Sequence, residues 1–308
     1  MLLHHFRPKL KAELPKFLLS PGKIEPVLCW EPKKALPGFD LADDITGGFD
    51  KLDRSVKPVD TFTGGTHSAL KRLNAFIRDQ LADYDEARNH PEIRGTSRLS
   101  PFLHFGNIGP LTIALAVEKA AREGKVPREK TEKFLEQVIG WRELSVLFVR
   151  HEPNYDSWEC AAPWARKSLL EHIGDSRDRY EFSQLERAET HDELWNAAQR
   201  EMVATGWMHN YMRMYWAKKI LEWAPDPAAA FDWAVTLNDR YELTGAIRTV
   251  TPALPGPSSA GTTGPGSISR SSGWCGQCPG LRLQRSLTRR PTWKHFQTTS
   301  RSYLINTF

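Results

Sequence analysis

Apolar side chains recur every three or four residues through most of the segment between residues 65 and 243, which is the spacing of amphipathic helices. Strands do not alternate with helices anywhere in this segment. The pattern therefore predicts an all-α fold. Six helices are expected, over residues 70–84, 100–124, 131–152, 190–206, 208–223 and 227–237.

Short signals mark where several of these helices begin and end. Ser100 followed by Pro101 offers an N-cap and a proline at the first helical position. Residues 190–193, Thr-His-Asp-Glu, form a capping box that starts a later helix, and Gly206 ends it. Pro225 closes the helix that follows.

The two ends of the chain differ from this helical body. Proline and glycine are scattered through the first 60 residues, which indicates a linker with short helical pieces. In residues 245–308, Gly, Pro, Ser and Thr fill half of the positions, and we expect no packed core there. The chain thus divides into a linker with the remnant of a preceding domain (1–64), a helical domain (65–244) and a disordered basic tail (245–308).

Composition favours a soluble globular protein of 308 residues and 35.1 kDa, and it excludes a peptide toxin or a fibre. No apolar run approaches the roughly 20 residues of a membrane-spanning helix, and the start of the chain does not form a secretory signal. We therefore expect a cytoplasmic protein without a membrane partner. The four cysteines are too few for a disulfide scaffold, and the single CxxC pair, Cys275 and Cys278, lacks a second pair, so no metal site is predicted.

The net charge of +5 comes from the tail. Residues 245–308 contain eight basic residues and no Asp or Glu, so residues 1–244 carry a net charge of −3. The tail could attract DNA without sequence preference. The helical body itself shows no basic excess.

Tryptophan is unusually frequent, with eleven in the chain and six of them on the predicted helices. Trp216 and Trp223 are seven residues apart on one predicted helix, hence on the same face and about 10 Å apart along its axis. This spacing suits a packed core and a chain of redox-active rings equally well.

Two further segments have polar side chains in suggestive places. Thr96, Ser97 and Ser100 stand just before a helix start, where hydroxyls and free N–H groups can either cap the helix or hold a pyrophosphate. Arg213 lies on a predicted helix rich in aromatic and thioether groups. Its burial would be costly unless it faced an anion or a carboxylate.

Six stretches of the helical body carry more specific motifs: TSRLSPFLHFG at 96–106, the segment 134–148, HEPNYD at 151–156, THDELWN at 190–196, the segment 206–223 and LNDRYEL at 237–243. In this order and with this spacing they resemble the class II cyclobutane pyrimidine dimer photolyases. The resemblance covers residues 65–243. It implies the helical domain of the photolyase/cryptochrome family, which folds FAD into a U shape and uses light to repair DNA.

In that family the lesion is flipped out of the duplex into a pocket above the flavin, and the excited reduced flavin donates an electron to it. The resemblance assigns the flavin-binding positions to Tyr84, Thr96, Ser97, Leu99, Ser100, Arg213 and Asn238, the last facing the flavin N5. It assigns the lesion-binding positions to Arg88, Asn89, Gln137, Trp141 and Met214. It assigns the relay that photoreduces the flavin to Trp216, Trp195 and Trp223, in that order outward.

Two departures from the family concern the front half and the lesion pocket. Nearly all of the N-terminal Rossmann-like domain is missing, so no antenna pigment is expected. Gln137 stands where the family commonly has a glutamate, and an amide cannot supply a charge or a proton in the same way.

The resemblance stops abruptly after Leu243. The family continues with Asp-Gly-Arg-Asp-Pro-Asn-Gly-Tyr, whereas this chain has Thr-Gly-Ala-Ile-Arg-Thr-Val-Thr from residue 244. One G inserted before codon 244 gives GAC GGG CGC GAT CCG AAC GGT TAC, which encodes the family sequence. We therefore hypothesise that a single-base deletion puts the tail out of frame.

The frameshift has a physical consequence in the candidate flavin site. In the family that the chain resembles, this aspartate pairs with the arginine that matches Arg213, so Thr244 is expected to leave this cation without its partner. We predict that the chain as written folds marginally and binds FAD poorly or not at all.

Two other functions stay open. A cryptochrome-like photoreceptor would use the same flavin and tryptophans without repairing DNA. An inactive DNA-binding helical protein would show no flavin absorbance after purification. If the photolyase assignment is correct, the partner is ultraviolet-damaged DNA and the protein is a monomer.

Overall fold

The computed structural model describes residues 2–22, residue 25 and residues 53–244. Within these residues the chain is helical and contains no strand, as the sequence pattern predicts. The first half holds α1 (Leu2–Phe17), α2 (Thr66–Asp79), α3 (Tyr84–Ala87), α4 (Ser100–His104), α5 (Pro110–Arg122), α6 (Arg128–Leu135), the π-helix η2 (Glu136–Trp141) and α7 (Arg142–His151). The second half holds the 3-10 helix η3 (Trp158–Cys160), α8 (Pro163–Glu171), α9 (Phe182–Glu186), α10 (Glu193–Thr205), α11 (Asn210–Trp223) and α12 (Pro227–Tyr241).

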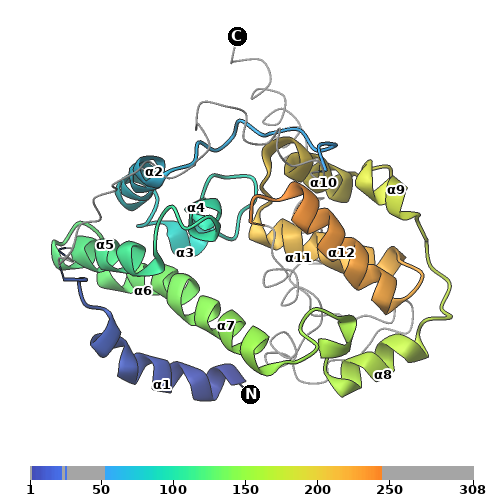
Figure 1. Ribbon diagram of the computed structural model, residues 1–308, viewed down its shortest axis with the longest axis horizontal. Coiled ribbons are helices and arrows are strands. Elements are labelled where there is room, and N and C mark those ends of the chain that lie inside the picture. Colours follow the sequence, from blue (N-terminus) through green and yellow to red (C-terminus); the bar gives the residue numbers. More distant parts are fainter. Residues whose placement is uncertain (1, 23–24, 26–52, 245–308) are drawn as a thin grey trace, which may run out of the picture.

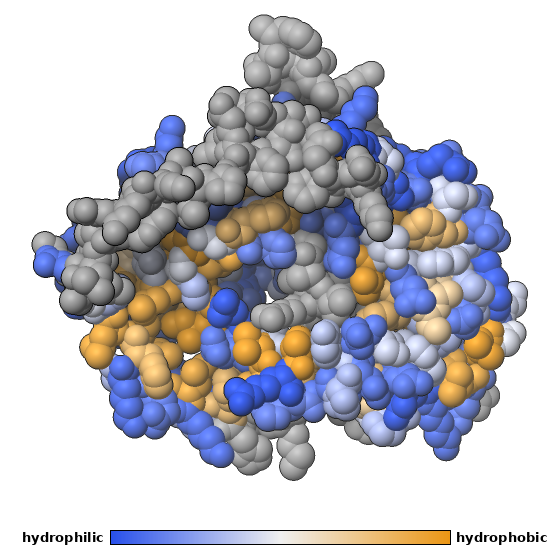
Figure 2. All heavy atoms as spheres, viewed as in Figure 1, coloured by the Kyte–Doolittle hydropathy of each residue, from blue (hydrophilic) through white to orange (hydrophobic). Residues whose placement is uncertain are grey.

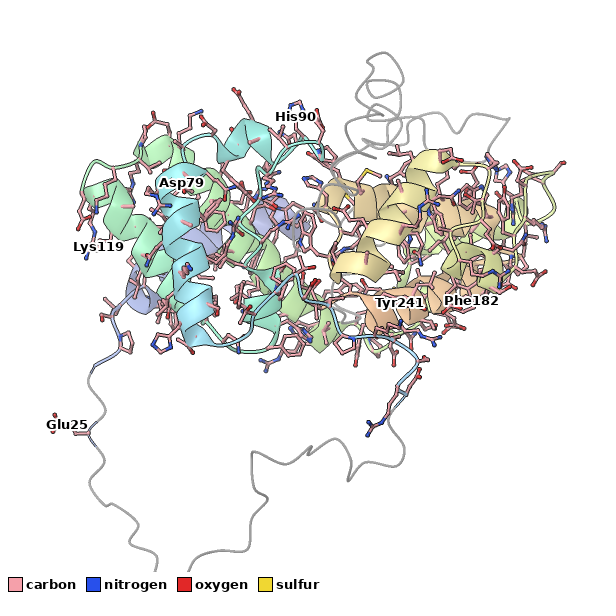
Figure 3. The ribbon with its side chains drawn as sticks, turned by 90° about the horizontal axis from the view of Figure 1, so that it is seen from above. Glu25, Asp79, His90, Lys119, Phe182 and Tyr241 are labelled. Atoms are coloured by element: carbon pink, nitrogen blue, oxygen red, sulfur yellow. The ribbon has the colours of Figure 1, made fainter. Side chains whose placement is uncertain are left out.

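Two hydrophobic cores divide the helices into two groups. The first core joins α2–α6 around the buried side chains of Leu73, Phe76 and Ile113. The second core joins α10–α12 around the fully buried rings of Trp195, Trp216 and their neighbours. Figure 1 shows the two groups side by side, with α7 leading from the first toward the second. Figure 3, turned by 90°, shows Asp79 and Lys119 in one group and Phe182 and Tyr241 in the other.

The predicted helix over 70–84 begins earlier and ends earlier than expected. It covers Thr66–Asp79, and a turn separates it from the short α3, which begins at Tyr84. Leu70 is 37% exposed, so it does not belong to the buried face. The register of that face is set by Ala69, Leu73 and Phe76, which are spaced by four and three residues.

The predicted helix over 100–124 is two helices. α4 ends after five residues, and Gly106 then adopts a left-handed φ of 68°, which reverses the chain before Pro110 opens α5. A left-handed residue cannot continue a helix, so the apolar spacing across this turn was misleading.

The predicted helix over 131–152 is continuous but contains a π-helical insert. α6, η2 and α7 follow one another from Arg128 to His151, and the insert covers Glu136–Trp141. Such inserts occur frequently at functional sites. This one contains both Gln137 and Trp141.

The helices of the second core have well-defined caps. Asp192, and not Thr190, is the N-cap of α10: its Oδ1 accepts from the N–H of Trp195 at 2.9 Å. Thr190 instead hydrogen-bonds Asn196 through its hydroxyl, at 2.8 Å. Gly206 ends α10 with a φ of 67°, as predicted.

α12 extends four residues beyond the predicted end at Leu237, to Tyr241. The helices α8 and α9 lie in a segment for which no helix was predicted. The front of the chain also differs from the expected linker with short pieces, because Leu2–Phe17 forms a helix of 16 residues. Its Arg7 forms an ion pair with Glu136 in η2. The basic tail and the CxxC pair lie outside the described residues.

The last part of the linker packs onto the helical body. Arg240 of α12 donates to the hydroxyl of Ser55 at 2.5 Å and lies 3.6 Å from a carboxylate oxygen of Asp53. Val59 lies close to Gly206, where a Cβ would come within 3.2 Å of it. None of the described helices is long and apolar enough to cross a membrane.

Candidate functional site

The loop that precedes α4 carries the predicted pyrophosphate-binding residues, and Arg72 of α2 holds it in place. The guanidinium of Arg72 donates to the carbonyl oxygens of Ser97 at 2.7 Å and Thr96 at 3.1 Å. A third bond reaches the side chain of Gln80 at 2.8 Å. Desolvation lowers the pKa of Arg72, with a further contribution from the charge of Arg94. Sequence reasoning missed Arg72, because nothing in a helical repeat shows that one polar side chain reaches a loop 24 residues away.

The same loop has an unusual backbone. Arg98 has a φ of 52°, a left-handed conformation that side chains other than glycine rarely adopt. Gly95 has no room for a side chain, because a Cβ there would lie 2.3 Å from the carbonyl oxygen of Ala87. The loop therefore has one specific shape, in which Leu99 is buried, Thr96 and Ser97 are half-buried and Ser100 is exposed.

Two contacts and one charge interaction connect this loop region with α10, α11 and the residues between these two helices. Tyr211 donates its hydroxyl to Oδ1 of Asn89 at 2.7 Å, across 122 residues of sequence. The guanidinium of Arg98 lies over the ring of Trp207, 4.3 Å from its centroid. Burial raises the pKa of Glu201 on α10 to about 7, and the charge of Arg98 opposes this shift.

Asn89 is less free than the resemblance implies. Its Oδ1 accepts from Tyr211, and its Nδ2 donates to the backbone carbonyl of Asp85 at 2.9 Å. Arg88 lies next to it, with its guanidinium 5.7 Å from the ring centroid of Tyr84. Tyr84 itself is buried between Phe76 and Phe134, and burial raises the pKa of its hydroxyl.

Arg213 has a carboxylate partner, contrary to the expectation from the sequence. It forms an ion pair with Glu242, whose side chain is fully buried, and donates to the hydroxyl of Thr244 at 3.3 Å. Burial lowers the pKa of Arg213 to about 10, so the side chain stays charged at neutral pH. Thr244 therefore does not leave this cation alone. Glu242 was part of the LNDRYEL motif at 237–243, but the motif comparison gave it no role toward Arg213.

Several polar side-chain atoms on or next to α11 and α12 are buried and have no hydrogen-bond partner among the described residues. They include Nε of Arg213, Oδ1 of Asn238, Oε2 of Glu242 and Nε2 of His209. His209 accepts from the N–H of Tyr211 with its Nδ1, so its neutral ring carries the proton on Nε2. Desolvation lowers the pKa of His209 to about 4, and the charges of Arg98 and Arg213 add to the effect. Buried polar groups without partners are rare, and each calls for an explanation such as a bound water, an ion or a catalytic role.

The three predicted relay tryptophans form one contiguous row inside the second core. The rings of Trp195 and Trp216 are stacked, with centroids 6.3 Å apart and planes 3° from parallel. Trp195 also meets Trp223 edge to face at 5.4 Å. Trp195 thus lies between the other two, which are about two turns apart along α11. All three rings are at most 1% exposed.

Each inner indole has a fixed polar partner. Trp195 donates its Nε1–H to the carbonyl of Trp216 at 3.1 Å, and Trp216 donates to Oε1 of the buried Gln199 at 2.8 Å. Beyond Trp223 the row reaches Tyr180, with centroids 5.2 Å apart. Tyr180 is half-buried, so the aromatic row continues toward the surface.

No family model matches the chain. Individual relatives do. A deoxyribodipyrimidine photo-lyase from Methanothermobacter thermautotrophicus is 43% identical over 242 residues, which are 78% of this chain and 51% of that protein. The protein with the same name from Oryza sativa is 37% identical over 246 residues, 78% of this chain and 48% of that protein. Among solved structures, a cryptochrome from Synechocystis matches with a TM-score of 0.57 at 20% identity, covering 82% of this chain and 50% of that one.

The chain belongs to the photolyase/cryptochrome family. A class III photolyase from Agrobacterium tumefaciens shares the fold as well, with a TM-score of 0.52 at 22% identity over 65% of this chain and 40% of that one. The chain spans about half the length of the two photo-lyases it matches.

The remaining lesion-pocket candidates of this photolyase-like chain stand apart from the relay. Gln137 and Trp141 lie in η2 of the first group, and Met214 lies on α11 of the second. Among the described residues, none of the three makes a ring contact or a hydrogen bond with the relay tryptophans. Figure 2 shows a recess between the two groups of helices.

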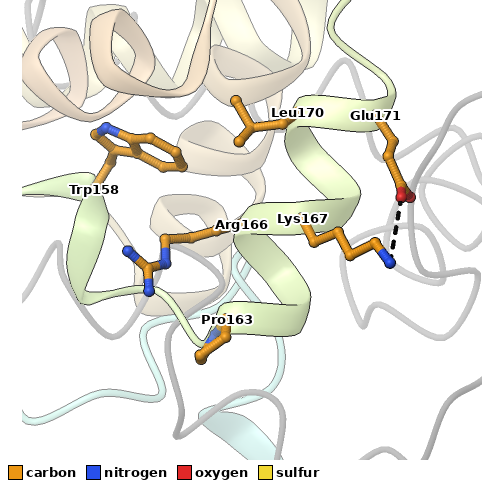
Figure 4. Close-up of a pocket in the computed structure, with 6 residues that line it drawn as sticks. All are labelled: Trp158, Pro163, Arg166, Lys167, Leu170 and Glu171. Atoms are coloured by element: carbon orange, nitrogen blue, oxygen red, sulfur yellow. Dashed lines mark ion pairs between the residues drawn. The ribbon is translucent and has the colours of Figure 1, made fainter.

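A second hollow, of about 630 Å³, is lined by Trp158 of η3 and by residues of α8 (Figure 4). Trp158, Pro163 and Leu170 give it apolar walls, and Lys167 pairs with Glu171 at its edge, 3.8 Å apart. It contains none of the candidate flavin or lesion residues. Within the described part of the chain, no cluster of His, Cys, Asp or Glu side chains is arranged to hold a metal ion.

Proposed function

We propose that the helical domain, residues 65–244, binds FAD and that the complete protein uses it for light-driven repair of cyclobutane pyrimidine dimers in DNA. The observation that carries this proposal is the buried row of Trp216, Trp195 and Trp223. A core needs apolar volume, but it does not need three indoles in continuous ring contact. Family membership supports the proposal, because proteins of the photolyase/cryptochrome family bind FAD.

The residues around Arg213 and the loop before α4 suit the two ends of such a cofactor. Thr96, Ser97 and Ser100, at the N-terminal end of a helix, offer hydroxyl and N–H groups to a pyrophosphate, with Tyr84 and Leu99 packed behind them. Arg213 offers a buried positive charge. Asn238 is 0% exposed, and its Oδ1 has no protein donor, which fits a polar N–H of a bound ring.

The bound flavin would supply light absorption and one-electron transfer to the dimer. The chain's own residues would do the rest. Arg88 and Asn89 would approach the lesion, with Asn89 fixed in orientation by Tyr211 and Asp85. Gln137, Trp141 and Met214 would form the wall against which a flipped-out base can pack. Trp216, Trp195 and Trp223 would deliver electrons from the surface to the flavin.

The buried environment of the relay supports this role. Trp195 and Trp216 donate to a carbonyl and an amide oxygen, neither of which can accept a proton at neutral pH. The protons therefore stay on these two indoles while an electron passes through them. Water is excluded from all three rings.

We infer further that the sequence from residue 244 is out of frame and that the protein is a cytoplasmic monomer. Because Arg213 retains a carboxylate partner, we expect this chain to bind FAD weakly, not to lose it altogether. Full repair activity is expected of a version that reads Asp-Gly-Arg-Asp-Pro-Asn-Gly-Tyr from position 244. Resequencing the DNA tests the deletion directly, since an unambiguous in-frame read rules it out.

A light-dependent repair assay tests the function. The frame-restored protein, loaded with FAD and chemically reduced, should convert thymine-dimer DNA to intact thymines in blue light and not in the dark. The chain as written should repair more slowly. Bound flavin without repair in either version would point to a photoreceptor, and no flavin in either would leave a DNA-binding remnant.

A further inference from the structure

Glu242 occupies an unusual position for a surface-type residue. It follows α12 directly and caps it, with its N–H bonded to the carbonyl of Asn238 at 2.9 Å. Its side chain nevertheless turns into the protein and is fully buried, where it pairs with Arg213 on α11. Glutamate is almost never fully buried unless it is paired.

The pair depends on both members, because each would be isolated without the other. Arg213 has two contacts in this region, the carboxylate of Glu242 and the hydroxyl of Thr244. A hydroxyl carries no charge, so among residues 2–22, 25 and 53–244 it is Glu242 that neutralises the guanidinium. Removing one partner of a buried pair leaves the other as an uncompensated charge, which is strongly destabilising.

Other carboxylates on α12 do not take this role. Asp239 is exposed, and it accepts from Nδ2 of Asn238 at 3.0 Å. Glu242 is one helical turn after Asn238 and so lies on the same face as this buried amide. Both residues keep one unpartnered oxygen there, and Arg213 keeps an unpartnered Nε.

We propose that Glu242, a residue of the LNDRYEL motif, is the counter-ion of Arg213 in this chain, where Thr244 stands in place of the carboxylate that the resemblance implies. Glu242 fixes the guanidinium in place and thereby sets how tightly the site holds an FAD molecule. The second half of this proposal rests on the proposed FAD site; the first half does not. Glu242 is a positioning residue, since it acts through Arg213.

Four proteins test the proposal: Glu242→Gln, Thr244→Asp, the double variant Glu242→Gln/Thr244→Asp, and the control Glu118→Gln. Glu118 pairs with Arg128 at the surface, 3.3 Å away, so its loss should change little. The thermal unfolding midpoint is measured without FAD, and the dissociation constant for FAD is then measured by flavin fluorescence.

Glu242→Gln should lower the midpoint by roughly 6–20 °C and weaken FAD binding by at least about tenfold. The double variant should recover most of both losses, because it returns one carboxylate to within reach of Arg213. This rescue would show that the lost charge, and not the lost packing of the Glu242 side chain, caused the effect. The new carboxylate stands two residues away and cannot restore that packing.

An unchanged midpoint in Glu242→Gln overturns the proposal, as does a double variant no better than the single one. If Glu242→Gln fails to fold, the double variant decides: a folded double variant supports the counter-ion role, and an unfolded one refutes it. If no protein binds FAD but the midpoints follow the expected order, the counter-ion role stands and the proposed FAD site fails.

Discussion

Replacing Trp195 by phenylalanine interrupts the middle of the tryptophan row while keeping an aromatic ring in the core. The indole of Trp195 is the only described ring that contacts both Trp216 and Trp223. A phenyl ring is far harder to oxidise than indole, so electrons could no longer pass from Trp223 to Trp216. We expect light-driven reduction of bound FAD to fall to a small fraction of its rate in the parent protein.

The cost in stability follows from the contacts that are lost. The hydrogen bond from Nε1 to the carbonyl of Trp216, 3.1 Å long, is worth about 1 kcal/mol. The smaller ring forfeits about 1–2 kcal/mol of packing at a site that is 0% exposed. The sum predicts a fall in the unfolding midpoint of roughly 4–12 °C, which leaves a folded protein to assay.

Trp233→Phe is the matched control. Trp233 lies on α12 at the edge of the same core, 5.9 Å from Phe182, and has no ring contact with the three relay tryptophans among the described residues. It should lose stability without losing photoreduction. The assay follows flavin absorbance under blue light with an external reductant, and chemical reduction with dithionite shows that both variants hold reducible FAD. Photoreduction of Trp195→Phe at the parent rate would refute the relay.

Three further predictions concern the loop before α4 and the contacts that join it to the second core. Arg72→Met should weaken FAD binding at least about tenfold because the loop carbonyls lose their donor, whereas Arg78→Met, an exposed change on the same helix, should not; equal affinities would contradict this. Tyr211→Phe should cost about 0.5–1.5 kcal/mol in urea unfolding and reduce repair by freeing Asn89, and unaltered stability would count against the bond. Burial raises the pKa of Glu201 to about 7 in the folded protein, so the free energy of unfolding should fall as the pH rises from about 5 to above 7. Glu201→Gln should abolish this part of the pH dependence. An unchanged pH profile of stability in the variant would contradict the raised pKa.

The helical character and the second core could be predicted from the sequence because local signals and packing agree there. Gly206 ends α10, and the row containing Trp216 and Trp223 lies on the buried face of α11. Where packing overrides local signals, prediction failed. The turn at Gly106 interrupts an apolar repeat, and the N-cap is Asp192 because its carboxylate reaches the N–H of Trp195.

The sequence predicted which residues belong to the candidate site, but it did not predict their hydrogen-bond and ion-pair partners. The motifs pointed to Ser97 and Asn238. The carbonyl of Ser97 accepts a hydrogen bond from Arg72, and Oδ1 of Asn238 is buried without a partner among the described residues. The partners of charged groups depend on which side chains meet after folding. Arg72 reaches the carbonyl of Thr96 across 24 residues and Glu242 reaches Arg213 across 29, and no short motif records such contacts.

An FAD titration of the purified protein, followed by fluorescence and gel filtration, tests the central claim most directly. The account predicts saturable binding of one FAD per chain, weak for the chain as written and tight for the version that reads Asp-Gly-Arg-Asp-Pro-Asn-Gly-Tyr from position 244. Failure of both proteins to take up FAD in a saturable manner would contradict it.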